Sequence, residues 1–131
     1  LAQEILASLP DGAAPSEESV LQVLRLWGFR KNKYRNNVLP DGQEFVFSDS
    51  FGLLRDSRVK RFPFVSQCTA PYMPFMQLLG RWFRGRLPEA LRKGPLAYTT
   101  VTVNKEYAAK RHRDRGNFGP SIGLATGDFT G

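Results

Sequence analysis

Apolar side chains recur at the spacing of an α-helix in the first two thirds of the chain, which predicts amphipathic helices there. The first predicted helix spans residues 1–9 and ends at the turn sequence Pro10-Asp11-Gly12. The second begins after Ser16, whose hydroxyl can cap the first turn, and stops at Gly28. This helix pair is expected to form a packing layer.

A third helix is predicted to begin at Pro74 and to end at Gly85, with a further helical turn over residues 88–93. Its arginines, among them Arg81 and Arg84, alternate with aromatic residues. The segment therefore resembles a nucleic-acid surface that combines phosphate neutralisation with base stacking. The helical spacing favours the simpler interpretation, in which the aromatic stripe is buried and the cationic face is solvated.

Short strands are predicted from aromatic and β-branched content at residues 43–47 and 61–65, separated by a polar loop over residues 48–52. The clearest strand is residues 98–104, where valines and threonines alternate. Residues 107–114 and 121–129 are expected to be extended as well. Helices followed by strands predict the α+β fold class.

Composition narrows the possible functions. The 131 residues, 41% of them hydrophobic, suffice for one domain core. The formal charge of +7 favours an anionic partner, either nucleic acid or an acidic protein surface in a larger complex. Cys68 is the single cysteine, so an intrachain disulfide and a cysteine-based zinc site are excluded. No apolar run is long enough to span a membrane, and we expect an intracellular, reducing compartment.

The single histidine limits the chemistry most. On an extended segment, His112 and Asp114 project to one face while Arg111, Arg113 and Arg115 project to the other. One imidazole and one carboxylate are two of the three ligands in the 2-His-1-carboxylate triad that binds iron(II). The arginines are candidate contacts to a polyanion. Taken alone, the pair is better explained as a surface histidine that forms a salt bridge with a carboxylate on a basic loop.

The surrounding sequence carries a resemblance over residues 99–131. A strand with Val101-Thr102-Val103-Asn104 leads to Ala108-Ala109-Lys110-Arg111-His112-Arg113-Asp114, then to Gly116-Asn117-Phe118-Gly119-Pro120-Ser121, and finally to Leu124-Ala125-Thr126-Gly127-Asp128-Phe129-Thr130-Gly131. This order resembles the segment around the first metal ligands in TET/JBP-like iron(II)/2-oxoglutarate dioxygenases of the algal and protist type. The chain is similar to the N-terminal part of such a domain.

The resemblance implies that His112 and Asp114 are the first two iron ligands and that Asn104 and Asn117 help to shape the cosubstrate and substrate pocket. It also implies a double-stranded β-helix, a jelly-roll of about eight strands with supporting helices. Only the first strands of that fold would be present. Residues 1–94 would be a helical support region with short strands, and residues 95–131 the start of the β-helix core. The implied reaction is oxidation of a modified base in nucleic acid with iron(II), O2 and 2-oxoglutarate.

The chain departs from the family in two ways. The distal histidine and the basic residue that binds 2-oxoglutarate are absent from these 131 residues. Both ends read as cuts in a longer polypeptide, so the missing residues are expected downstream. The alternative is a noncatalytic structural or interaction subunit of a larger assembly, built on a degenerate oxygenase-like scaffold.

Two other enzyme classes fit less well. His112-Arg113-Asp114 is similar to the catalytic loop of protein kinases, but Gly119 stands where a kinase has asparagine, and no glycine-rich phosphate loop occurs. A serine or cysteine nucleophile would need His112 as its base, and no nucleophile-elbow sequence surrounds any candidate.

Overall fold

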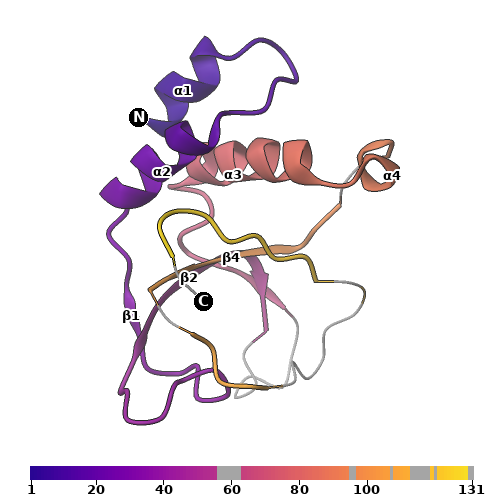
Figure 1. Ribbon diagram of the computed structural model, residues 1–131. Coiled ribbons are helices and arrows are strands. Elements are labelled where there is room, and N and C mark those ends of the chain that lie inside the picture. The colour runs from indigo at the N-terminus through magenta and orange to yellow at the C-terminus, as the bar shows by residue number, and fades with distance from the viewer. Residues whose placement is uncertain (56–62, 95–96, 107, 113–118, 120, 130–131) are drawn as a thin grey trace. The chain divides into compact units, whose positions relative to one another are not determined.

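The computed structural model describes residues 1–55, 63–94, 97–106, 108–112, 119 and 121–129. It confirms the α+β class, with helices and an antiparallel sheet. The elements in chain order are α1 (Ala2–Ser8), α2 (Glu17–Leu26), β1 (Lys31–Asn32), β2 (Val46–Leu54), β3 (Phe64–Val65), α3 (Met73–Arg86), α4 (Glu89–Arg92) and β4 (Thr100–Lys105) (Figure 1).

Contacts divide the chain into two compact units. Unit 1 contains residues 1–27, 51–101 and 124–131, and unit 2 contains residues 28–50 and 102–123. Each unit is therefore built from segments distant in sequence. The division into a support region over residues 1–94 and a core over residues 95–131 stays a prediction.

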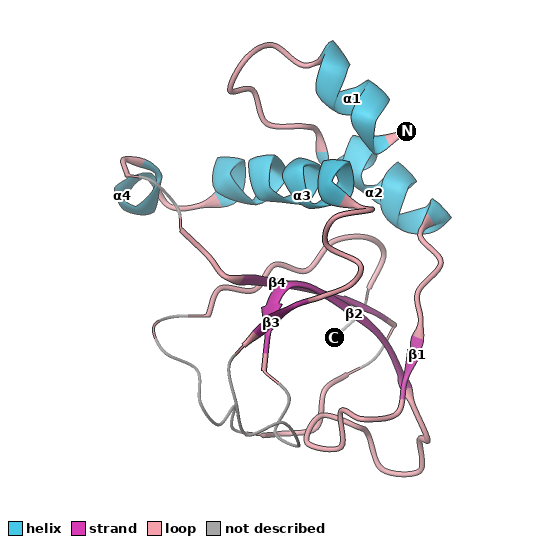
Figure 2. Ribbon diagram, turned by 180° about the vertical axis from the view of Figure 1, so that it is seen from behind, coloured by secondary structure: helices cyan, strands magenta, loops and turns pink. Residues whose placement is uncertain are grey.

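Strand β2 is the centre of the sheet and pairs with all three other strands (Figure 2). Its first residues pair antiparallel with β1, with Lys31 opposite Phe47, and its last residues pair antiparallel with β3, with Leu53 opposite Val65. Strand β4 also pairs with β2. The burial of β4 alternates, because Val101 and Val103 are half-buried and their threonine neighbours are exposed, as the sequence predicts.

The predicted polar loop over residues 48–52 is wrong, since these residues lie inside β2. Ser48 and Asp49 are buried there at 3% and 2% exposure. Their polar groups are paired with distant side chains, because Arg30 binds Asp49 and Asn104 accepts a hydrogen bond from Ser48. Burial of polar groups is tolerated when hydrogen-bond partners replace water. These long-range partners therefore explain how a polar run can form a buried part of β2.

The core of unit 1 is aromatic and lies against α3. The Trp27 ring stacks on Phe75 with centroids 4.4 Å apart, and both rings meet the fully buried Phe51 edge-on. Helices α1 and α2 both pack against α3. Ser16 caps α2 as predicted, because its hydroxyl accepts from the Ser19 backbone N–H at 3.1 Å.

The remaining element predictions are partly correct. Helix α3 continues past Gly85 to Arg86, and an added Cβ at Gly85 would lie 2.6 Å from the Ala14 side chain, so this glycine permits close packing inside the helix. The predicted strands over residues 107–114 and 121–129 do not form in the described parts, which are residues 108–112 and 121–129. In the described part of the chain, no helix is both long and apolar enough to cross a membrane.

Candidate functional site

His112 lies at the end of a described segment that follows β4, and its ring is exposed. Its Nδ1 atom lies 2.6 Å from the backbone carbonyl oxygen of Lys110. A carbonyl oxygen only accepts, so Nδ1 must carry the proton in this hydrogen bond. In the neutral ring, Nε2 then holds the lone pair.

Lys110 is held at both ends against the turn that includes residues 38–41. Its backbone N–H donates to the Val38 carbonyl at 3.1 Å, and its ammonium donates to Asp41 Oδ1 at 2.7 Å. That hydrogen bond, together with the charge of Lys110, lowers the pKa of the exposed Asp41 carboxyl below its ordinary value. The carbonyl that orients His112 is thus fixed by its neighbours in unit 2.

This arrangement matches the surroundings of metal-binding histidines. Such a histidine usually donates its second ring N–H to a carbonyl or carboxylate, which fixes the tautomer and increases the basicity of the ligating nitrogen. The Lys110 carbonyl has this position relative to His112. The imidazole is therefore suited to bind a metal through Nε2.

Four predicted site residues lie outside the described residues, namely Arg113, Asp114, Arg115 and Asn117. The shared projection of His112 and Asp114 accordingly stays a prediction. Among the residues that the structure describes, no three histidine, cysteine, aspartate or glutamate side chains form a group that could hold a metal ion.

Asn104 lies on β4 and takes part in a polar cluster on one face of the sheet. The Arg35 guanidinium donates to the Ser48 hydroxyl at 3.0 Å, and that hydroxyl donates to Asn104 Oδ1 at 2.8 Å. The Ser50 and Thr102 hydroxyls meet at 2.9 Å beside this relay. The hydrogen bond to Oδ1 directs the Asn104 amide donors away from Ser48.

Arg35 and Ser48 were not among the candidates from sequence. Local pattern offers no signal for them, since Arg35 lies in a basic connection and Ser48 in a polar run. Only the pairing of β2 with β4 brings both side chains to Asn104.

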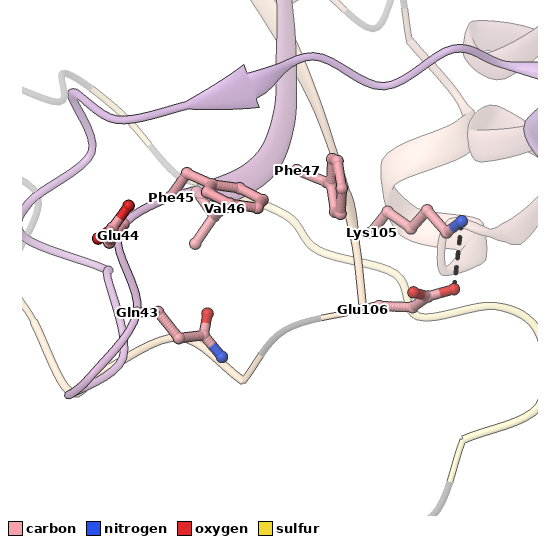
Figure 3. Close-up of a pocket in the computed structure, with 7 residues that line it drawn as sticks. All are labelled: Gln43, Glu44, Phe45, Val46, Phe47, Lys105 and Glu106. Carbon is pink, nitrogen blue, oxygen red and sulfur yellow. Dashed lines mark ion pairs between the residues drawn. The ribbon is translucent and has the colours of Figure 1, made fainter.

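Unit 2 also has a surface hollow of about 350 Å³ at the ends of β2 and β4. Figure 3 shows Gln43, Val46 and Phe47 around the space, with Lys105 turned toward Glu106 in an ion pair of 3.3 Å. Glu106 has a positive φ of 51°, an unusual backbone conformation for a residue other than glycine. Lys105 and Glu106 neutralise each other in this hollow, and His112 is not among the residues that line it.

The candidate arginines differ in their surroundings. Arg111 is exposed next to His112, whereas Arg81 is half-buried on α3. Arg84 donates through Nη2 to the backbone carbonyls of Arg92 and Gly94, at 3.4 and 3.2 Å. Trp82 is only 7% exposed, so it is unavailable for stacking on a base and the interpretation as a buried aromatic stripe holds for this residue.

The fold and these contacts define an α+β protein in which unit 2 contains an oriented histidine and, separately, a polar cluster on the sheet. No protein-family model, curated protein or solved structure matches the chain.

Proposed function

We propose that this chain forms part of an iron(II)/2-oxoglutarate-dependent dioxygenase-like protein that acts on a modified base in nucleic acid. The observation that carries the proposal is the hydrogen bond from His112 Nδ1 to the Lys110 carbonyl. It selects the tautomer that an Nε2 metal ligand needs. The sequence order that resembles TET/JBP-like dioxygenases supplies the identity of the metal and cosubstrate.

The metal ligands that this chain could supply are of types that bind iron(II). His112 would bind through Nε2 and Asp114 through a carboxylate oxygen, which are the donor types of the 2-His-1-carboxylate triad. Because the chain contains one histidine, the second imidazole must come from outside these 131 residues. The jelly-roll fold belongs to the same proposal, with β2 and β4 as two of its strands.

Within the site, the residues of this chain would orient and bind. The Lys110 carbonyl fixes the His112 ring, and the Ser48 hydroxyl fixes the Asn104 amide. Asn104 and Asn117 would then contact the cosubstrate or substrate. Bound iron(II), with O2 and 2-oxoglutarate, supplies the oxidising chemistry.

Anaerobic iron(II) titration of the protein with the remaining ligands present tests the proposal. We expect His112→Ala to weaken iron binding at least about 10-fold, the loss that accompanies removal of interactions around a metal. Glu44→Gln is the control, because Glu44 is an exposed carboxylate in the same unit. It should bind iron as the unchanged protein does.

Equal iron binding by the unchanged protein and His112→Ala would contradict the proposal. Absence of iron binding in both would favour the alternative, a noncatalytic interaction subunit. In that case we would expect the exposed arginines of the chain to bind an acidic protein surface in a larger complex.

A further inference from the structure

Helix α3 carries a second polar surface that the iron proposal does not use. Gln77, Arg81 and Arg84 follow one another at the spacing that places side chains on one helix face. Together with Leu6, Gly80 and Tyr98, they line a hollow of about 400 Å³ in unit 1. This size lies within the range of pockets for small ligands.

The lining is cationic, and the described residues that form it include no carboxylate. Among the described residues, the Arg81 guanidinium, the Gln77 amide and the Tyr98 hydroxyl have no hydrogen-bond or ion-pair partner. Arg84 uses Nη2 for two backbone carbonyls, which leaves its other nitrogens available. Other arginines are neutralised, since Arg30 pairs with Asp49 and Arg86 with Glu17.

Gly80 determines the shape of the hollow. A Cβ added there would lie 2.6 Å from the Tyr98 hydroxyl oxygen and 3.7 Å from the ring carbon that bears it. The absent side chain therefore lets the phenol approach the backbone of α3. Tyr98 is 48% exposed, so its ring can also meet a ligand.

We propose that this hollow binds a small phosphate monoester. The doubly charged phosphate group would lie between the Arg81 and Arg84 guanidinium groups, whose planar donors match phosphate oxygens. Gln77 and Tyr98 would donate further hydrogen bonds. Leu6 and the Tyr98 ring form an apolar wall for the organic part of the ligand. A singly charged phosphodiester would leave one of the two arginines without a counter-charge.

Calorimetric titration with a nucleoside monophosphate, the free nucleoside and inorganic phosphate tests this site. We expect the monophosphate to bind most tightly, inorganic phosphate more weakly, and the nucleoside not at all. Affinity for the monophosphate should rise as pH increases through about 6, where its second proton leaves.

Three variants separate a formed pocket from diffuse charge. Arg81→Gln should weaken monophosphate binding at least about 10-fold, the equivalent of one charged hydrogen bond. Gly80→Ala keeps the charge and favours the helix, yet it should also weaken binding because Tyr98 must move. Arg25→Gln is the matched control, since Arg25 is an exposed arginine on α2, and it should have little effect.

The proposal is overturned if Arg25→Gln and Arg81→Gln reduce binding equally, or if Gly80→Ala leaves binding unchanged. Tighter binding of a short single-stranded oligonucleotide, or of an acidic peptide, than of the monophosphate would also overturn it. Iron(II) binding through His112 should be unaffected by Arg81→Gln, so the two sites fail independently.

Discussion

At the scale of single residues, the buried polar side chains of β2 are paired with distant side chains rather than solvated. The Asp49 side chain is only 1% exposed, and it accepts from both the Arg30 guanidinium and the Arg30 backbone N–H. Arg30 itself is 62% exposed, so water still screens part of the ion pair. The main contribution of Asp49 is therefore to satisfy donors at the start of unit 2.

Asp49→Ala should lower the free energy of unfolding by about 2 kcal/mol, the value of a hydrogen bond to a charged group. Urea denaturation measures this change. Glu18→Ala removes an ion pair to Arg25 in which both side chains are mostly exposed, and it should cost much less. Equal losses in the two variants would show that the burial of Asp49 contributes nothing.

The candidate site could be predicted from sequence only in part. The spacing of His112 and the resemblance around it made the imidazole and Asn104 candidates, and their roles stay predictions. Sequence could not identify the carbonyl of Lys110 as the group that orients the ring, because a backbone acceptor leaves no residue signature. Arg35 and Ser48 were missed because their contacts with Asn104 depend on strand pairing.

At the scale of elements, the helices were predictable, whereas the central strand was predicted only at its start. The predicted helices follow the apolar period, and Ser16 and Pro74 lie at their first turns as capping preferences suggest. The start of strand β2 lies in the predicted strand over residues 43–47, but the sequence predicts a loop over its residues 48–52 because this polar run has no alternation of apolar and polar residues. Its partners are Arg30 and Asn104, which lie far away in sequence.

Gly52 provides a test of how closely β2 and β4 approach. It has a φ of +89°, and an added Cβ would collide with the backbone carbonyl of Thr99. Gly52→Ala should therefore destabilise the protein by at least about 3 kcal/mol, the upper cost of local backbone strain, since the clash adds to it. Gly42 has a φ of +81° with nothing near its Cβ position.

Gly42→Ala is the matched control, because it has the same backbone penalty without the collision. Thermal unfolding of both variants measures the difference. The account of the β2–β4 contact is wrong if the two substitutions lower the melting temperature equally.

Glu17 couples the start of α2 to two other segments of unit 1. The hydrogen bond from Thr126 and then the one from Arg86 lower the pKa of its carboxyl below the ordinary glutamate value. A lowered folded-state pKa stabilises the protein above the unfolded-state pKa, and this contribution disappears as pH falls through the folded-state value.

Stability should therefore decrease as pH falls below about 4.5, the ordinary value of this carboxyl. Glu17→Gln should reduce that dependence, and urea midpoints measured across the acid range provide the measurement. Glu18→Gln, which changes the adjacent exposed carboxylate, is the control. An unchanged pH profile in Glu17→Gln would exclude the coupling.

At the scale of the whole molecule, the chain combines an oriented histidine in unit 2 with a cationic hollow in unit 1. Both rest on basic residues, in agreement with the formal charge of +7. The proposed iron site needs ligands that these 131 residues do not contain, whereas the proposed phosphate site is formed within unit 1. The iron proposal therefore requires residues from outside this chain, whereas the phosphate proposal does not.

The single histidine permits one direct measurement of the central claim, which is that the Lys110 carbonyl selects the His112 tautomer with the proton on Nδ1. Long-range proton–nitrogen NMR correlations of the ring in uniformly 15N-labelled protein need no assignment of other histidines. We predict a protonated Nδ1 and an unprotonated Nε2 in the neutral ring. Protonation of Nε2 in the neutral ring, with Nδ1 left unprotonated, would contradict the account.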